Sequence, residues 1–262
     1  MSDIDKAPAD LQQLVADSDT GGRAAGGAAG VVIFAAAIGW ALFQLWYASP
    51  LPFALGIGLL NDTEARALHL GLALFLAFLA FPASRRGMRH AVPLYDWVLA
   101  FVAAFAGAYL LLFYDQLATR PGQPTGFDIV VATVGIVLLL EATRRAVGTP
   151  MAILAMIFIG YIFLGPHLPD VIAHKGASLE RMISHMWLTT EGVYGVALGV
   201  SVGFIFIYVL FGSLLDRAGA GNYMMQVSFP LLGHLRGGPA KAAVVSSALN
   251  GLISGSSVSN VV

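Results

Sequence analysis

The residues with the clearest capacity for chemistry lie near the end of the sequence, in the uncharged stretch 242–262. Hydroxyl, amide and glycine residues gather there between two apolar arms, at Ser254, Gly255, Ser256, Ser257 and Asn260. Hydroxyl and backbone carbonyl oxygens are the ligands that hard cations prefer. Inside a membrane, non-helical backbone is tolerated only where protein buries it or where it lines a cavity. The pattern therefore predicts a broken helix or re-entrant hairpin whose tip presents oxygens to a cation.

Three more polar residues precede this tip in the first apolar arm: Ser246, Ser247 and Asn250. Small residues allow membrane helices to pack closely, and this explains Ser246 and Ser247 adequately. Asn250 and Asn260 either fasten the two arms together or contribute amide oxygens, and the sequence does not decide between these roles. We therefore treat the three upstream residues as candidates for substrate contact or for support of the hairpin.

Two residues farther upstream, Glu191 and Trp187, are candidates for a gate or for contact with a partner protein. Glu191 opens an expected membrane span, where a carboxylate also favours a helix N-terminus. Trp187 ends an amphipathic helix predicted from Leu179 onward, with Ser178 as its N-cap. This helix is either a docking ledge for an extracytoplasmic partner or a linker that lies on lipid with its tryptophan at the headgroups.

Other polar residues favour structural roles. Glu141 stands three and four residues before Arg144 and Arg145, a spacing that predicts ion pairs along one helix. The histidines of the long loop share no helix face, so we expect loop residues rather than a metal site. The chain has no cysteine, no paired intramembrane aspartates and no zinc-protease or P-loop motif, which argues against an enzyme.

Composition sets the environment of these residues. Hydrophobic residues make up 58% of the chain and charged residues only 11%, whereas soluble domains average about 25% charged. The fold class expected is an all-α integral membrane protein that lies in a lipid bilayer. The net charge of −1 argues against nucleic acid as a partner.

Apolar runs long enough to cross a bilayer predict about six transmembrane helices plus one re-entrant helical hairpin. The expected spans are about Gly30–Ala48, Ala67–Pro82, Tyr95–Tyr114, Phe127–Val147, Thr149–Gly165 and Gly192–Leu215. Residues 50–58 contain two prolines and two glycines, which indicates a turn or an interfacial segment rather than another span.

Positive residues in the loops predict the orientation. One side holds nine: Lys6, Arg23, Arg85, Arg86, Arg89, Arg144, Arg145, Arg217 and Arg236. The other side holds four: Arg66, Arg120, Lys175 and Arg181. Because positive residues are retained on the cytoplasmic side, we expect a cytoplasmic N-terminus, cytoplasmic residues 216–241 and external residues 166–190.

The same residues carry a resemblance to a known family. The motif Gly237-Gly238-Pro239-Ala240-Lys241, followed by the stretch 254–262, resembles the first hairpin of the large membrane subunit of TRAP (tripartite ATP-independent periplasmic) transporters, of the fused TAXI type. Ser259 stands where this family more often has alanine. The similarity extends upstream through Thr190-Glu191-Gly192, Phe211-Gly212-Ser213-Leu214-Leu215 and Gly219-Ala220-Gly221.

The resemblance implies a domain organisation. Residues 1–23 would be a polar cytoplasmic tail, and residues 24–147 a four-helix scaffold that resembles the small TRAP subunit. Residues 148–190 would supply a linker helix and the amphipathic external helix. Residues 191–262 would be the start of the large subunit with its first hairpin. Since inverted-repeat transporters need two halves and only one hairpin is present, we expect an incomplete transporter that is inactive alone.

The resemblance also implies a function. The chain would be the permease component of a sodium-coupled secondary transporter in a bacterial inner membrane, taking up an organic-acid-like solute. Its partners would be a periplasmic solute-binding protein and the remainder of the large permease subunit. Sodium would be the coupling ion at the hairpin tip, with no other cofactor. The alternative left open is a structural scaffold subunit of a membrane transport assembly.

Overall fold

The computed structural model describes residues 22–23, 25–84, 91–234 and 236–254. The secondary structure of this part is helical, and no strand occurs within it, which confirms the all-α class. The chain divides into two compact units, residues 1–202 and 203–262, and each is described by itself.

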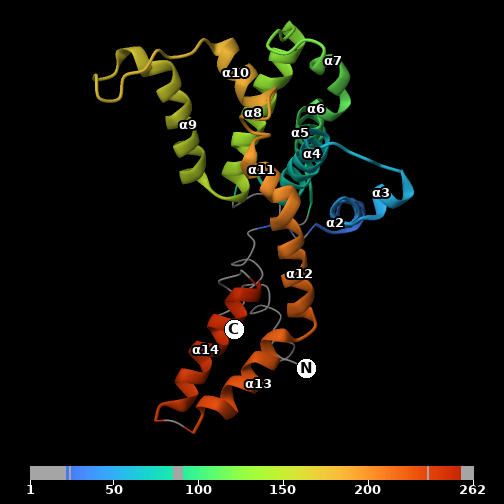
Figure 1. The fold of residues 1–262 in the computed structure, drawn as a ribbon, viewed down its shortest axis with the longest axis vertical. Coiled ribbons are helices and arrows are strands. Elements are labelled where there is room, and N and C mark those ends of the chain that lie inside the picture. The colour runs from blue at the N-terminus through green and yellow to red at the C-terminus, as the bar shows by residue number, and fades with distance from the viewer. Residues whose placement is uncertain (1–21, 24, 85–90, 235, 255–262) are drawn as a thin grey trace. The chain divides into compact units, whose positions relative to one another are not determined.

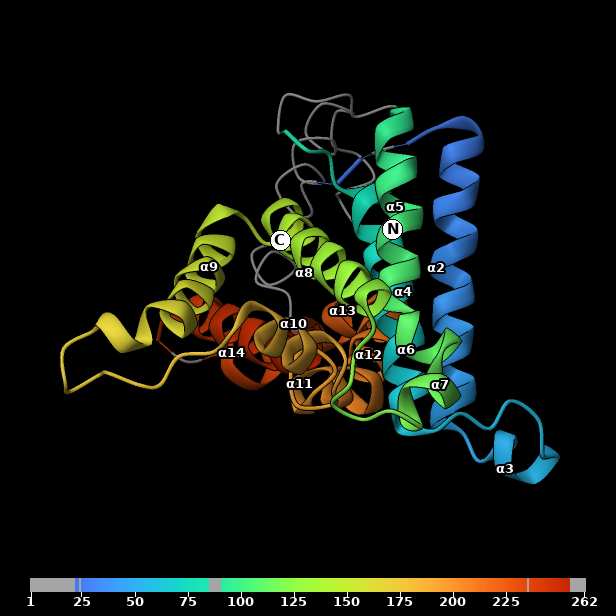
Figure 2. The ribbon, with the colours of Figure 1, turned by 90° about the horizontal axis from the view of Figure 1, so that it is seen from above.

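The first unit is built around α4 (Asp62–Ala80), which packs against α2 (Gly27–Ala48), α5 (Leu94–Gly107) and α8 (Gly126–Ala146) (Figure 2). Helix α9 (Thr149–Leu164) follows and lies against α8. The buried core combines large side chains of α4 with the small face of α5, at Leu74, Phe78, Leu79, Ala100 and Ala103. Large side chains on one helix that face small side chains on the next allow the two helices to interdigitate.

Five of the expected spans are confirmed as helices long and apolar enough to cross a membrane: Gly27–Ala48, Asp62–Ala80, Gly126–Ala146, Thr149–His167 and Val196–Leu215. Between the first two, the short helix α3 (Leu51–Leu55) ends at a left-handed glycine. This agrees with the predicted turn or interfacial segment.

The expected third span is not one continuous helix. It is divided into α5, α6 (Tyr109–Leu112) and α7 (Tyr114–Ala118). The helix is interrupted where side chains from outside it donate hydrogen bonds to its backbone carbonyls. The Trp187 indole donates to the Ala106 carbonyl at 3.1 Å, and the Tyr194 hydroxyl donates to the Gly107 carbonyl at 2.8 Å. Burial also raises the pKa of the Tyr194 phenol well above its usual range. The run of apolar residues predicted length correctly but could not predict these tertiary hydrogen bonds.

The end of the bundle that holds the start of α5 and the end of α8 carries a buried charge network. Asp96 is fully buried and pairs with Arg23 and, at 2.7 Å, with Arg145. Glu141 pairs with Arg144 and Arg145 at 2.7 Å, as its helical spacing predicts. Arg23 therefore belongs to the folded bundle, whereas the sequence places it in a polar tail.

The expected sixth span contains an irregular turn. Helix α11 (Val196–Val200) runs into a π-helical segment, Ser201–Ile205, before α12 (Phe206–Arg217) begins. Single π turns inside α-helices occur frequently at functional sites. The boundary between the two compact units falls within this segment.

The second unit continues from α12 into α13 (Ala220–Leu232) and α14 (Gly238–Ser254), which lie side by side (Figure 1). Residues 216–241, which the sequence analysis treats as a segment between membrane elements, contain α13 over half of their length. The sequence itself indicates this helix, because Ala220–Leu232 has no charged residue and its one proline, Pro230, lies near the C-terminal end.

Candidate functional site

The predicted hairpin starts from a tight turn between α13 and α14. Gly237 has a φ of +70°, and a Cβ on Gly238 would lie 2.3 Å from the Gly233 carbonyl oxygen. Glycine is needed at both positions, because other residues rarely adopt the first conformation and would clash at the second. The Gly237-Gly238 motif therefore has a structural cause, which is the close return of the chain.

One face of α14 is made of small residues that recur every four positions. Gly238, Ala242 and Ser246 are all buried, and Ser246 is 5% exposed. Ser228 on α13 is also buried. Small residues at this spacing allow two helices to approach closely, so Ser246 fits the role of hairpin support. Ser247, the next residue, is half-buried.

The first predicted arm, residues 242–253, is helical as part of α14, which is described as far as Ser254 and includes Asn250. The tip residues Gly255, Ser256, Ser257 and Asn260 lie outside the described residues, so the cation site there stays a prediction. What the described helix contributes is an uncharged, helical approach to the predicted tip.

Helix α10 (Leu179–Trp187) is confirmed, with the Ser178 hydroxyl accepting from the Arg181 amide at 3.3 Å. Its predicted place on the lipid surface is wrong for Trp187, which is 0% exposed. The indole packs so closely against Gly135 of α8 that a Cβ there would lie 2.3 Å from it. Trp187 therefore anchors α10 to the bundle and offers no surface to headgroups or to a partner.

Glu191, the second partner or gate candidate, lies in a turn before α11. Its side chain is 76% exposed and stands 3.8 Å from the His185 imidazole. The N-cap of α11 is Gly195, so Glu191 does not open the helix as expected. Because the chain turns between 189 and 195, a carboxylate expected at the helix end is instead available to solvent.

The structure brings together a polar cluster that the predicted site lacks, made of Gln44, His69 and Ser201. His69 Nδ1 is 3.1 Å from the Trp40 indole nitrogen and 2.5 Å from Gln44 Nε2, and His69 Nε2 is 3.2 Å from Ser201 Oγ. An indole nitrogen can only donate, so Nδ1 accepts and the proton resides on Nε2. The imidazole thus donates to the first residue of the π-helical segment.

Arg66 holds the same part of the chain from one turn earlier in α4. Its guanidinium donates to the carbonyls of Tyr194 and Gly195 at 2.8 and 3.1 Å and pairs with Asp62. Together, Arg66 and His69 fix the start of the expected sixth span to α4. An ionisable residue inside an apolar span is itself a signal, and this rule would have identified His69 from the sequence.

None of the described residues forms a group of three or more acidic, histidine or cysteine side chains suited to a metal ion. The loop histidine His174 instead makes local hydrogen bonds: its Nε2 donates to the Tyr161 carbonyl and its Nδ1 accepts from the Gly176 amide, both at 3.0 Å.

Comparison with known proteins gives one family match. Residues 134–262 match the family model described as "Tripartite ATP-independent periplasmic transporter, DctM component". Neither the curated proteins nor the solved structures contain a match to the chain. The matched residues begin within α8 and include α9 to α14, and thus the hairpin that carries the resemblance. Residues 134–262 therefore correspond to the DctM component of a tripartite ATP-independent periplasmic (TRAP) transporter permease, and the described helices of the chain include five that are long and apolar enough to cross a membrane.

Proposed function

We propose that this permease couples the uptake of an organic-acid-like solute to sodium entry, with the tip after α14 as the sodium site. The observation that carries the proposal is the course of α14 itself. The helix has no charged residue after Lys241 and is described as far as Ser254, and the sequence continues there into the glycine and hydroxyl residues of the tip.

The helix break that the sequence predicts at this tip would suit a cation for two reasons. The last four carbonyls of a helix have no intrahelical partner, and the helix dipole places partial negative charge at that end. In secondary transporters, broken helices present such carbonyls to coupling ions near the middle of the membrane. Oxygen ligands without sulfur or imidazole also match the preference of a hard cation such as sodium.

The solute would be delivered by an extracytoplasmic binding protein, as the TRAP family implies. The permease would lie in the bacterial inner membrane with its N-terminus in the cytoplasm. Single cysteines introduced into the cysteine-free chain test this orientation. An impermeant thiol reagent added to intact cells should label position 175 and not position 241, and the opposite pattern would reverse the topology.

The sodium proposal is tested in proteoliposomes that contain the whole permease, with the binding protein outside. Ser256→Ala and Ser257→Ala should each raise the sodium concentration needed for half-maximal uptake, while the amount of inserted protein stays unchanged. Ser213→Ala is the matched control, because its hydroxyl bonds within α12 to the Val209 carbonyl. Sodium activation unchanged in both tip variants and in their double variant would contradict the assignment.

The alternative, a scaffold subunit without a transport role, has a different expectation. Uptake would then survive every substitution in α14 that preserves assembly. Loss of uptake in the tip variants, with normal co-purification of all subunits, would exclude it.

A further inference from the structure

Four positive residues lie at the end of the first unit where α4 begins and α9 ends, two on helices (Arg66 on α4 and Arg181 on α10) and two in loops (Arg120 and Lys175). Two of them are already engaged, since Arg66 pairs with Asp62 and Arg120 lies 3.1 Å from the Asp128 carboxylate. The other two, Lys175 and Arg181, are exposed, and their side chains form no ion pair with any described residue. Both converge on one groove.

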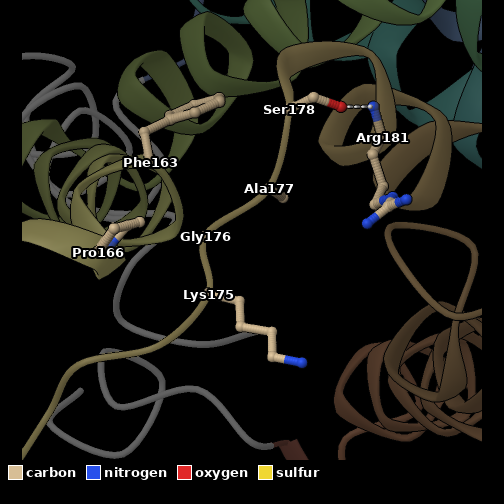
Figure 3. A pocket seen from close by; sticks show the side chains of 7 residues that line it. All are labelled: Phe163, Pro166, Lys175, Gly176, Ala177, Ser178 and Arg181. Carbon is tan, nitrogen blue, oxygen red and sulfur yellow. Dashed lines mark hydrogen bonds between the residues drawn. The ribbon is translucent and has the colours of Figure 1, made fainter.

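This groove lies between the end of α9 and the start of α10 and has a volume of about 360 Å³. In Figure 3, Lys175 and Arg181 extend to one side of the Gly176–Ala177 segment, while Phe163 and Pro166 lie on the other. No carboxylate lines it. The groove therefore combines an apolar wall with two unpaired positive charges.

The loop that carries Lys175 is held by specific contacts. The Tyr161 hydroxyl donates to the Ile172 carbonyl at 2.9 Å, and the ring of His174 packs onto Gly165 so closely that a Cβ there would lie 2.3 Å from it. Gly176 has a φ of +69°, and a Cβ on it would meet Pro166 at 3.0 Å. These contacts preorganise the loop, which lowers the entropic cost of binding a partner.

Arg181 is presented by a helix that is equally fixed. The opposite face of α10 buries Met182, Ile183 and Trp187 in the core of the first unit. Arg181 consequently points away from the core on a rigid element. The docking ledge considered from the sequence thus keeps its support, whereas its lipid-facing alternative does not.

We propose that this groove docks acidic side chains of the extracytoplasmic solute-binding protein, an inference that rests on the proposed function. A guanidinium and an ammonium side by side match carboxylates, with the arginine able to bind one bidentately. The rest of this end exposes acidic groups, at Asp62, Asp115, Asp170, Glu180 and Glu191. Like-charge repulsion would keep an acidic partner off those positions and direct it to the groove.

The test uses the whole permease in phosphatidylcholine proteoliposomes and measures the dissociation constant of the binding protein. Replacing both cations by glutamine (K175Q/R181Q) should raise it about tenfold, and charge reversal (K175E/R181E) should raise it roughly 100-fold. The neutral variant K175Q/R181Q should also flatten the dependence of affinity on ionic strength, because the attraction it removes is screened by salt. Substituting Lys for the paired acidic residues of the binding protein should restore binding to K175E/R181E.

The matched control is R217E/R236E, which reverses two other exposed arginines and changes the net charge equally. Its dissociation constant should stay within twofold of the unmodified permease. The same result for K175E/R181E would overturn the docking proposal. In matched proteoliposomes that also contain phosphatidylglycerol, loss of bound phosphatidylglycerol in K175E/R181E without any change in binding-protein affinity would overturn it too, since the groove would then be a lipid site.

The proposed function is tested by a separate measurement, the accumulation of solute on a sodium gradient. If the unmodified permease accumulates no solute on a sodium gradient, sodium-coupled uptake is wrong whatever the groove binds. If uptake proceeds and K175E/R181E binds normally, only the docking surface is wrong.

Discussion

The two units of this permease are stabilised in different ways. The first unit buries large polar and aromatic side chains, with Asp96, Trp187 and Tyr194 all fully enclosed. Among the described side chains of the second unit, those that are buried are small, at Gly212, Ser228, Gly238, Ala242 and Ser246. Buried polar groups need partners with defined geometry, whereas small residues only permit helices to approach. The comparison suggests that directional bonds hold the first unit in one arrangement and that the second depends on close helix contact.

The largest effect should come from the buried charge network of the first unit. Asp96→Asn leaves Arg23 and Arg145 without the carboxylate that both contact. Removing one partner of a buried ion pair costs about 3–5 kcal/mol. We expect the midpoint of unfolding, followed by intrinsic fluorescence in detergent micelles, to fall strongly. Asp115→Asn, which changes an exposed carboxylate, is the control, and equal midpoints for the two variants would contradict a structural role for the network.

The next largest effect should come from the contact between α8 and α10. Gly135→Ala places a methyl group against the Trp187 ring, which overpacks the core at a cost of about 1–3 kcal/mol. Gly160→Ala is a matched control inside α9, where no atom lies near the added methyl. There, alanine should stabilise the helix by about 0.5–1 kcal/mol. If the two variants change the unfolding midpoint in the same direction, Trp187 is not the anchor described.

The features that the sequence could predict are those that depend on local spacing. Helix positions depend on apolar length, so five spans, the cap at Ser178 and the Glu141 ion pairs follow from local spacing. The break after Gly107 and the burial of Trp187 do not, because both arise from contacts between residues about 80 positions apart. Periodicity reports which face of α10 is apolar, but not whether lipid or protein covers that face.

The predicted site shows the same limit. Composition singled out the small and polar residues of α14, and the structure gives Ser246 and the Gly237-Gly238 turn a physical role. The cluster of Gln44, His69 and Ser201 was missed, since its members come from three separate elements. Only the intramembrane histidine carried a local signal.

That cluster gives the third prediction, which concerns the start of the π-helical segment. Ser201→Ala removes the acceptor for His69 Nε2 and should cost about 1 kcal/mol, the net value of one hydrogen bond. We expect faster amide hydrogen exchange at residues 196–205, with exchange at α5 unchanged. Ser184→Ala, on α10, controls for loss of a hydroxyl. Unaltered exchange at 196–205 would show that the imidazole does not fix this turn.

The smallest effect on overall stability should come from a substitution in the second unit. This substitution best distinguishes a unit held by directional bonds from one that depends on close helix contact. Ser246→Leu adds bulk to the small face of α14, where close approach to α13 is required. The local cost should be about 1 kcal/mol, seen as faster hydrogen exchange at residues 220–254. All four tryptophans lie in the first unit, so selectively excited tryptophan fluorescence reports that unit alone, and its unfolding midpoint should stay unchanged. Val244→Leu, at a position 69% exposed, should alter neither measurement.

A fluorescence midpoint that falls with Ser246→Leu would mean that the first unit draws stability from the second. The contrast between the two units would then be wrong.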